Sequence, residues 1–405
     1  MTTPMAPSFL RKTSDGSPAT PERFRCAVFK SQGDPLELTT VDYRKPGKGQ
    51  LVIKVHGTAL SNNDAISEHG LLNMYATFPR TPGMYAVGEI VQLGPGAVEG
   101  GSTGGVLSAL LSRLTIGKTK EKEGEEPAVH HRFKTGEKVI ISATHQCLGE
   151  YCTGRAESTC PLMENWPVFE QLVVATFGGK VLDAYERHAE EWDRKSSDER
   201  RVLDDNNDRI GFAGDGCIVI LGQGGYASLA YHLLRAETRR DERIVLVSTS
   251  KKHRPDDFGM PSEDYLSVGQ EGLVDALRKM GGIKLAITTD QPYEGAVEML
   301  DAMRYGGEMV PLTLHEDGKI QRPVAHLIAR SLVVRGPVDL HSSSMHRALR
   351  ICEKHGLDRH VSIHKFEFTE EGVRQAWDAT KNQRDDFSAN VVVFDTQGES
   401  SRHAA

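Results

Sequence analysis

Cysteine is scarce in this sequence and long hydrophobic runs are missing, and each shortage excludes a class of protein. The 405 residues include six cysteines, too few for a scaffold held together by disulfides, so a reducing compartment is expected. No apolar run reaches the roughly 18 residues that suggest a membrane-spanning helix. The formal net charge of −7 lacks the basic excess of nucleic-acid-binding proteins. These features predict a cytoplasmic protein with no membrane or nucleic-acid partner.

Residues 1–24 are rich in Ser, Thr and Pro and lack the continuous apolar segment of a secretory signal. We therefore expect a disordered tail there. The remaining chain is long enough for two or three domains, because one domain usually holds about 100 to 200 residues.

Short apolar strands separated by Gly and Pro turns occupy the first part of the chain. They are expected at residues 26–29, 50–55, 86–93 and 138–142. Such a pattern predicts a small β-barrel or a partly open barrel. An interruption at 97–132 combines an apolar stretch (106–114) with a run of mixed charge (118–126). A solvated surface insertion is the favoured interpretation, and a lid or a dimer contact is the alternative.

Strands and helices alternate from residue 216 onward. Just before this region, residues 182–204 are charge-rich and helix-prone, which predicts a charged linker helix. Residues 217–221 form an apolar run typical of a strand buried on both faces. The alternation predicts a doubly wound parallel sheet. The strands expected in it, up to about residue 336, are 217–221, 244–247, 285–288, 309–314 and 332–334, and the helices are 227–236 and 271–280. After this region two more helices, 344–354 and 370–381, and a last strand, 390–394, are expected.

A glycine-rich turn directly after the first of these strands carries the strongest chemical signal. Its sequence is Gly222-Gln223-Gly224-Gly225-Tyr226-Ala227. Glycines there allow a tight turn and a close approach of the backbone to a pyrophosphate, whose charge lies at the N-terminus of the next helix. The placement between a strand and a helix indicates a dinucleotide-binding site, and an ordinary strand-to-helix turn is the alternative.

The end of the next strand indicates which dinucleotide is bound. NAD-binding enzymes usually place Asp or Glu there to bind the ribose 2′-hydroxyl. This chain instead has hydroxyl and ammonium groups, which can hold a 2′-phosphate. They are Ser248, Thr249, Ser250, Lys251 and Lys252. We therefore predict NADP(H) as the cofactor; the alternative is that the two lysines only face solvent.

Several motifs outside this region resemble the medium-chain dehydrogenase/reductase superfamily. They are the segment 33–38, the segment Pro46-Gly47-Lys48-Gly49-Gln50 with the strand after it, Pro79-Arg80-Thr81-Pro82-Gly83, the strand 87–91 with Gly94-Pro95-Gly96, Phe133-Lys134-Thr135-Gly136-Glu137-Lys138-Val139, and the segment 327–336. The resemblance spans roughly residues 25–396 and weakens at the insertion and at 180–215. It implies an α/β fold with a GroES-like β-barrel catalytic domain that is split in sequence around a Rossmann domain. The expected boundaries are 1–24 (tail), 25–185 (catalytic domain), 186–340 (Rossmann domain) and 341–405 (return to the catalytic domain).

The residues at the metal positions differ from those of zinc-dependent members of this superfamily. Where those members have a Cys this chain has Ser61, and where they have a His-Glu pair it has Met84 and Tyr85. A catalytic zinc needs three ligands of Cys, His or carboxylate type. We therefore predict no metal, as in the quinone and enoyl reductases of the superfamily.

The resemblance also implies a vestige of the four-cysteine structural zinc site. Cys152 and Cys160 match its last two ligands, while the first two positions hold Gln146 and Gly149. Cys147 lies one residue out of register, with His145 close by. Free thiols are the favoured interpretation, and a zinc held by a shifted loop is the alternative.

Catalytic candidates follow from the same alignment. Tyr85 and Ser61 replace metal ligands and are expected to line the cleft, where Tyr85 could donate a proton or a hydrogen bond to a substrate carbonyl. Asn63, with Asn62, could orient the substrate or the nicotinamide ribose. The apolar helix that contacts the nicotinamide in this superfamily is expected before the glycine turn, where this chain has the charged stretch 182–210.

We therefore predict a zinc-independent, NADPH-dependent oxidoreductase that reduces an activated alkene or carbonyl of a small organic molecule, with specialised (secondary) metabolism as a hypothetical setting. The alternative is a family member without hydride transfer, which acts as a binding or scaffold protein or directs a non-redox reaction in the same cleft; the charged stretch motivates it. The resemblance also implies a homodimer, paired near residues 332–334.

Overall fold

The computed structural model describes residues 20–61, 63–64, 78–97, 133–143, 147–209, 212, 215–238, 242–250, 252–289, 295–313, 324–336, 340–382 and 388–394. Most of the predicted tail and nearly all of the predicted insertion lie outside these ranges. Among the described residues, no helix is long and apolar enough to cross a membrane.

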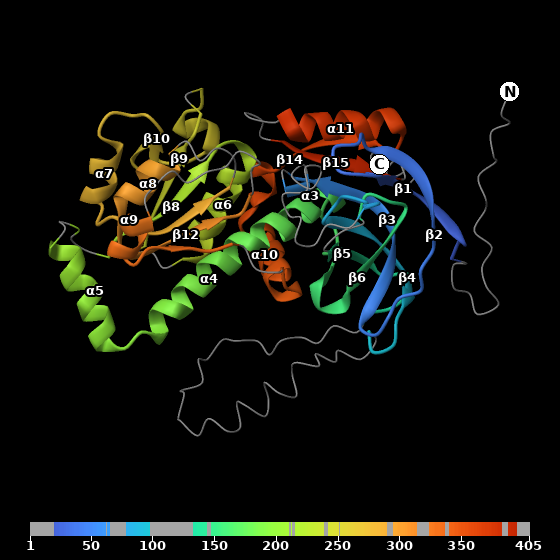
Figure 1. Ribbon diagram of the computed structural model, residues 1–405, viewed down its shortest axis with the longest axis horizontal. Helices are drawn as coiled ribbons and strands as arrows, with labels where there is room; N and C mark the ends of the chain where they lie inside the picture. Colours follow the sequence, from blue (N-terminus) through green and yellow to red (C-terminus); the bar gives the residue numbers. More distant parts are fainter. Residues whose placement is uncertain are drawn as a thin grey trace, which may run out of the picture.

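One domain is built on a mostly antiparallel seven-stranded sheet (Figure 1). Its strands run in the order β14-β15-β3-β4-β5-β7, and β6 pairs with β3. Their bounds are β3 Gln50–Leu60, β4 Tyr85–Leu93, β5 Lys138–Ser142, β6 Tyr151–Arg155, β7 Thr159–Pro161, β14 Ser362–Glu367 and β15 Ser388–Val393. A separate pair, β1 (Arg23–Val28) and β2 (Glu37–Asp42), lies beside it. The end of the chain therefore returns to the domain in which the chain began, as the resemblance implied.

The other domain contains a six-stranded parallel sheet in the order β10-β9-β8-β11-β12-β13. The bounds are β8 Cys217–Gly222, β9 Arg243–Ser248, β10 Tyr265–Ser267, β11 Ile283–Thr288, β12 Met303–Pro311 and β13 Val333–Val334. Every residue of β8, the predicted doubly buried strand, is buried. Strand order reverses on either side of β8, so the crevice at its carboxyl end is the topological switch point where ligands bind in such sheets.

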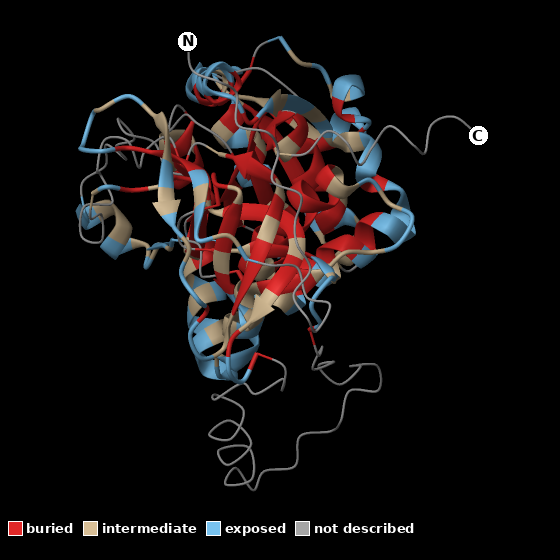
Figure 2. Ribbon diagram, turned by 90° about the vertical axis from the view of Figure 1, so that its right-hand side faces the viewer, coloured by how far each residue is buried: buried red, intermediate tan, exposed pale blue. Residues whose placement is uncertain are grey.

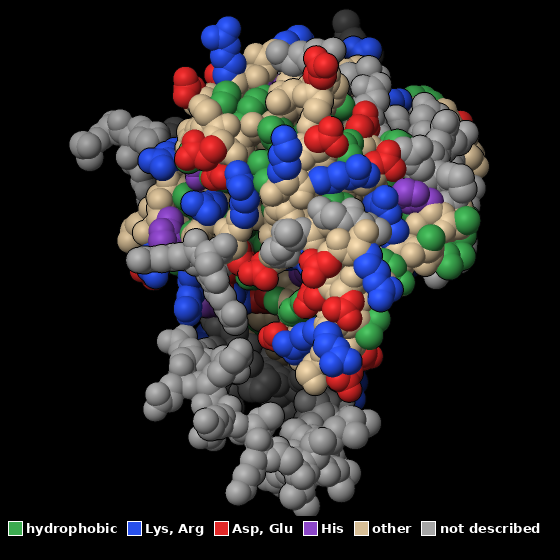
Figure 3. Space-filling view, turned by 90° about the vertical axis from the view of Figure 1, so that its left-hand side faces the viewer, with side chains coloured by type: hydrophobic (Ala, Val, Ile, Leu, Met, Phe, Trp, Pro, Cys, Tyr) green, Lys and Arg blue, Asp and Glu red, His purple; other side chains and the backbone are tan. Residues whose placement is uncertain are grey.

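Helices cover both faces of the parallel sheet. Figure 2 shows the buried residues concentrated at the centre of the molecule, with exposed residues around them. One face packs against α4 (Gly179–Arg194) and α6 (Gly224–Glu237). The other face packs against α7 (Leu273–Lys279) and α8 (Ala296–Ala302). This is the doubly wound arrangement that the alternating pattern predicted. On the outer face at this end of the molecule, basic and acidic side chains are intermingled (Figure 3).

The segment between the two sheets is more apolar at its start than the sequence analysis assumed. It consists of α3 (Val168–Val173), a π-helical turn (Val174–Gly178), α4 and α5 (Ser197–Arg209). Its first part, up to Ala184, is almost wholly buried. The predicted charged helix exists, but it continues an apolar helix that begins upstream. The two domains share one core there, because this helix, α6, α10 (Ser342–His355) and β15 all contribute to it.

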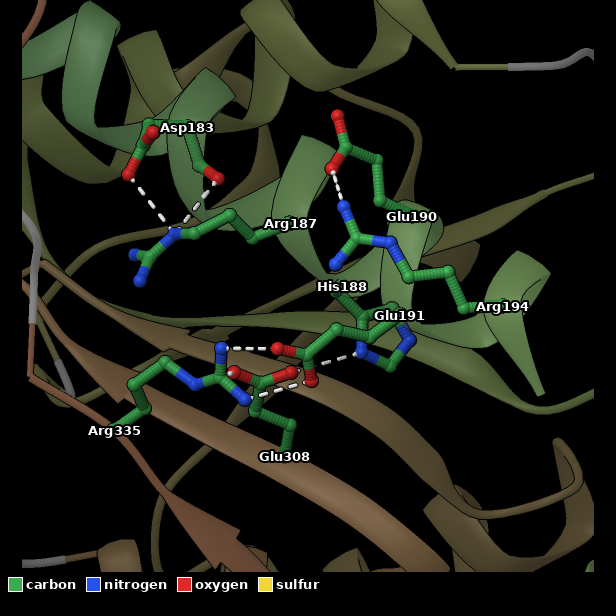
Figure 4. Close-up of polar contacts among 8 residues, drawn as sticks. All are labelled: Asp183, Arg187, His188, Glu190, Glu191, Arg194, Glu308 and Arg335. Carbon is green, nitrogen blue, oxygen red and sulfur yellow. Dashed lines mark hydrogen bonds and ion pairs between the residues drawn. The ribbon is translucent and has the colours of Figure 1, made fainter. Parts of the chain in front are cut away.

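Charged side chains on the second half of α4 bind the end of the parallel sheet (Figure 4). Arg335, just after β13, donates two hydrogen bonds to Glu191, at 2.5 and 2.7 Å. Its Nε lies 3.0 Å from the buried Glu308 of β12, and Nδ1 of His188 lies 3.2 Å from the same carboxylate. Within α4, Figure 4 also shows the ion pairs Asp183–Arg187 and Glu190–Arg194. The charged half of α4 is therefore anchored rather than a solvated linker.

Elements that sequence patterns missed are short or lie at edges. They are β2, β6, β7, β10, β14, α3 and α8, together with α9 (Val324–Ala329). The remaining predicted strands and helices appear with shifts of a few residues at their ends.

Candidate functional site

The glycine turn lies at the carboxyl end of β8, where it was predicted. Gln223 is extended, with φ −144° and ψ 172°, and α6 begins at Gly224, which has φ +67°. A Cβ at Gly222 would lie 2.1 Å from Oγ1 of Thr289. A side chain is therefore excluded where the strand ends, and the first residues of α6 that follow, Gly224 and Gly225, are buried.

Three threonine hydroxyls beside this turn have no hydrogen-bond partner among the described residues. Thr249 follows β9, Thr289 follows β11 and Thr313 follows β12, and the Oγ1 atoms are buried. Because the carboxyl ends of parallel strands meet at one edge of a sheet, the three hydroxyls lie along the same crevice. A buried hydroxyl without a partner is costly, so this row fits a ligand rich in oxygen atoms.

The serines predicted to bind the ribose, Ser248 and Ser250, make hydrogen bonds within the turn after β9. The Ser248 hydroxyl donates to the Ser250 carbonyl at 3.0 Å and accepts from the Ser250 N–H at 3.2 Å. The Ser250 hydroxyl accepts from the N–H of Lys252 at 3.2 Å. The side chain of Lys252 is exposed, and Lys251 lies outside the described residues. Residues 248–254 contain no carboxylate, and the acid that contacts the end of this segment is Asp257, which accepts a hydrogen bond of 2.7 Å from the N–H of Arg254.

On the barrel side, the residues after β3 form a compact turn around Asp64. Its Oδ2 accepts hydrogen bonds of 2.9 Å from both the N–H and the hydroxyl of Ser61, and its Oδ1 accepts one of 3.0 Å from the N–H of Gly83. Burial raises the pKa of Asp64, while these bonds and the nearby Lys180 oppose the rise. Ser61 is thus held by Asp64, and Asn62 lies outside the described residues.

Asn63 connects the barrel to the parallel sheet. Its Nδ2 donates to the carbonyl oxygen of Leu312, in the loop after β12, at 3.2 Å, and its side chain is buried. The structure therefore brings Asn63 to the crevice edge, next to Thr313, with this amide donor engaged across the domain interface.

Tyr85, the first residue of β4, is buried at the same interface. Nζ of Lys180 lies 4.8 Å from the centre of its ring. The ring of Tyr226 lies 4.6 Å from that of Phe177. Burial raises the pKa of Tyr226, with added contributions from Asp64 and Tyr85, so its hydroxyl remains a neutral donor. Residues from β4, α4, α6 and the turn after β3 thus form one polar cluster beside the glycine turn.

Sequence reasoning missed Lys180, Asp64, Thr289 and Thr313, whereas it named Thr249 with the hydroxyl groups after the second strand. A single lysine in the apolar stretch 172–184 was a usable signal, because lysine is rarely buried without a role. The same stretch belongs to an apolar helix before the glycine turn, the kind of helix that was expected at residues 182–210 to contact the nicotinamide. Its Thr176 is buried and donates to the carbonyl of Leu172 at 2.7 Å.

The three cysteines of the vestigial zinc site separate into two cores. Cys147 and Cys152 belong to the core inside the barrel sheet, whereas Cys160 packs into the core shared by the domains. Burial raises the pKa of Cys160 to about 12, and the hydrogen bond with Cys152 and burial both raise the pKa of Cys147. All six cysteines are free thiols. Among the residues that the structure describes, no three potential metal ligands gather.

No protein-family model matches the chain. Alcohol dehydrogenase patD of Penicillium expansum is 21% identical over 342 residues, which cover 84% of this chain and 90% of that protein. Alcohol dehydrogenase notN of Aspergillus sp. (strain MF297-2) is 22% identical over 379 residues, which cover 92% and 99%.

Two solved structures have a similar fold. A cinnamyl alcohol dehydrogenase from Sorghum bicolor has a TM-score of 0.62 at 14% identity, covering 92% of this chain and 97% of that one. A quinone oxidoreductase from Pseudomonas syringae pv. Tomato DC3000 has a TM-score of 0.61 at 13% identity, covering 91% and 99%. The barrel sheet joined to a doubly wound parallel sheet is thus the fold that this chain shares with these two solved structures.

Proposed function

We propose that this protein is a zinc-independent, NADPH-dependent oxidoreductase that reduces an activated alkene or carbonyl of a small organic molecule. The observation that carries the proposal is the crevice at the end of β8. There a glycine turn that leaves no room for a side chain at Gly222 adjoins the Tyr85 cluster of the barrel, and the strands on either side end in threonines whose buried hydroxyls have no partner among the described residues. Such an arrangement supports a dinucleotide on one side and a substrate on the other.

The residues present fit a dinucleotide with a 2′-phosphate. Gly222, Gly224 and Gly225 would hold the pyrophosphate at the N-terminus of α6. Thr249, unpartnered and directly after β9, would face the adenosine ribose, next to a turn that contains no acid. A carboxylate there would repel a 2′-phosphate, and its absence supports NADP(H) over NAD(H).

Zinc independence rests on the donor atoms of the residues concerned. Ser61 is bonded to Asp64, and Met84 packs against the core shared by the domains. Tyr85 has its ring beside an ammonium group, which opposes a second cation at that point. These side chains are not the Cys, His and carboxylate set that a catalytic zinc requires.

In this proposal Tyr85 donates a hydrogen bond to the substrate oxygen and then transfers its proton. NADPH, when bound, supplies a hydride, and the substrate gains that hydride and one proton while NADP⁺ is released. The phenol of Tyr85 is restored by a proton from solvent. A preorganised donor lowers the barrier because negative charge grows on the oxygen during reduction. Asn63, whose hydrogen bond to Leu312 joins the two domains, would keep the barrel domain, and with it Tyr85, in place over the crevice.

The alternative without hydride transfer was motivated by the apparent loss of the apolar helix before the glycine turn. That helix is present at Val168 to Ala184, so the observation no longer favours the alternative.

We further propose a homodimer formed through β13. This strand is an edge of the parallel sheet, and Val333 and Val334 are 39% and 41% exposed. On α9, Val324 and Ile328 are 67% and 71% exposed. An open strand edge beside exposed apolar side chains supports pairing with a second copy. Light scattering of wild type and of Val334→Lys tests it, with loss of a dimer expected in the variant and a monomeric wild type contradicting it.

The function is tested by titrating the purified protein with NADPH and NADH while following nucleotide fluorescence, with zinc measured on the same sample. Tighter binding of NADPH than NADH, without stoichiometric zinc, is expected. Turnover is then screened with cinnamaldehyde, 2-hexenal and a benzoquinone. Failure to bind either nucleotide contradicts the proposal, and so does zinc that is essential for turnover.

A further inference from the structure

Lys180 is a buried lysine whose charge has no direct partner among the residues that the structure describes. It is 9% exposed, and its ammonium makes neither a hydrogen bond nor an ion pair with any described residue. The ammonium lies against the Tyr85 ring, with Nζ 4.8 Å from the ring centre. A ring face attracts the cation, but it does not accept hydrogen bonds from the three N–H groups in the way that an oxygen atom does. Burying an ammonium in this state is costly unless a ligand completes its bonding.

The nearest carboxylate does not fill this role. Both oxygens of Asp64 already accept hydrogen bonds, from Ser61 and Gly83. Asp64 also lies within electrostatic range of a second buried cation, Arg80. Among the described residues, two buried cations, Lys180 and Arg80, therefore lie within electrostatic range of the single carboxylate of Asp64.

The position of Lys180 indicates which ligand it serves. It is the second residue of α4 and stands against Tyr85, the proposed proton donor. The pyrophosphate of a dinucleotide is expected instead at the glycine turn, where backbone N–H groups and the N-terminus of α6 are available. An anion at Lys180 would therefore belong to the molecule whose oxygen meets Tyr85.

We propose that Lys180 binds a carboxylate of the substrate, so that the reduced molecule is a small organic acid that carries an alkene or a carbonyl group. This inference rests on the proposed function for the identity of the second ligand. Binding of a carboxylate at Lys180, however, can be measured without turnover and without nucleotide.

The test compares benzoate with its neutral analogue benzamide by calorimetry, on the full chain with and without NADPH. Benzoate is expected to bind roughly ten- to a hundredfold more tightly than benzamide, as a charge-assisted hydrogen bond to a buried ammonium implies. Lys180→Met is expected to abolish this preference and Lys180→Arg to retain most of it. Lys195→Met is the matched control, because Lys195 also lies over a ring, that of Trp192, at the far end of α4.

The outcomes separate the two proposals. If NADPH does not bind but benzoate binding depends on Lys180, the oxidoreductase fails and the anion site stands. If Lys180→Met weakens NADPH and leaves benzoate unchanged, Lys180 serves the nucleotide and the inference is overturned. Equal binding of benzoate and benzamide to the wild type, or no binding of benzoate, also overturns it. Melting temperatures of all variants check that each is folded.

Discussion

Nδ2 of Asn63 donates a hydrogen bond of 3.2 Å to the carbonyl oxygen of Leu312 across the interface of the two domains. Asn63 follows the longest strand of the barrel sheet, and Leu312 follows β12 of the parallel sheet. Thr313, the next residue, has an unpartnered hydroxyl in the crevice. The bond therefore fixes the distance between the turn that carries Asp64 and the edge that is proposed to bind nucleotide.

Removal of this bond is expected to weaken nucleotide binding more than folding. Asn63→Ala deletes one buried hydrogen bond, and we expect about 1 to 3 kcal/mol of lost stability. NADPH affinity is expected to fall several-fold, because the two sides of the crevice are no longer held together. Asn382→Ala is the control, since Asn382 also donates to a main-chain carbonyl, that of Asp378, but is exposed. Unchanged NADPH affinity in Asn63→Ala would show that the bond has a structural role alone.

Because the Thr289 hydroxyl has no partner among the described residues, we expect its removal to weaken NADPH binding without lowering the stability of the fold. Thr289→Val keeps the shape and removes a buried hydroxyl without a partner, so the melting temperature is expected to stay the same or rise. NADPH affinity is expected to fall by about tenfold if the hydroxyl bonds to the nucleotide. In the control Thr380→Val, the hydroxyl lost is bonded to Ala376 and Asn390, so stability falls and NADPH affinity does not. A Thr289→Val protein with normal NADPH affinity would remove Thr289 from the site.

Gly222 is expected to tolerate no side chain. A Cβ there would lie 2.1 Å from Oγ1 of Thr289, so Gly222→Ala should lower both the melting temperature and NADPH affinity. In Gly222→Ala/Thr289→Ala the clashing atom is gone, and the melting temperature is expected to recover in part. Gly336→Ala is the control, because nothing lies within 4 Å of a Cβ at that position. Equal effects of the Gly222 and Gly336 variants would contradict the close packing at the end of β8.

Sequence patterns were sufficient for the inner strands of the parallel sheet, such as β8, β9 and β11, because these strands are almost wholly buried. β8 and its glycine turn lie where the apolar run and the glycines predicted them. Edge strands such as β14, whose residues are half-buried or exposed, have no such pattern and were missed. The apolar helix was missed because it was expected within the charged residues 182–210, whereas it begins upstream at Val168.

The site was predictable only where its functional residues lie next to one another in a single segment of the sequence. The glycine turn is such a segment, and it was found. Asp64, Lys180 and Tyr226 come from three segments that only the fold brings together around Tyr85. Asn63 was selected for a possible contact with substrate, whereas its amide donor bonds to Leu312. A partner in another domain leaves no local sequence pattern.

The phenol of Tyr85 is expected to matter for turnover and not for nucleotide binding. Tyr85→Phe removes the proposed proton donor, and we expect kcat to fall by about 10² to 10⁴, the usual contribution of a general acid. The NADPH dissociation constant should stay within about twofold. Tyr43→Phe is the control, since it removes a phenol bonded to Gln92 in the barrel sheet. A Tyr85→Phe enzyme with wild-type kcat on any substrate found in the screen would assign the proton to another group.

His360 predicts how stability depends on pH. It stacks on His232 with ring centres 3.9 Å apart, and its Nδ1 lies 3.1 Å from the hydroxyl of Ser228 on α6. Burial, then the nearby charges of His232 and Arg359, lower its pKa from 6.5 to about 4. Burial lowers the pKa of His232 as well. Both imidazoles are therefore neutral in the folded protein at neutral pH.

Because the unfolded chain binds a proton at His360 below pH 6.5 while the folded chain does not until about pH 4, stability is complete above pH 6.5 and falls between these values. One such group gives a slope of at most about 1.4 kcal/mol per pH unit. His360→Asn is expected to flatten this slope in urea unfolding measured from pH 7 to pH 4.5. His355→Asn, an exposed histidine at the end of α10, should leave it unchanged. If the free energy of unfolding depends on pH with the same slope in wild type and in His360→Asn, another titrating group controls acid unfolding and the prediction is wrong.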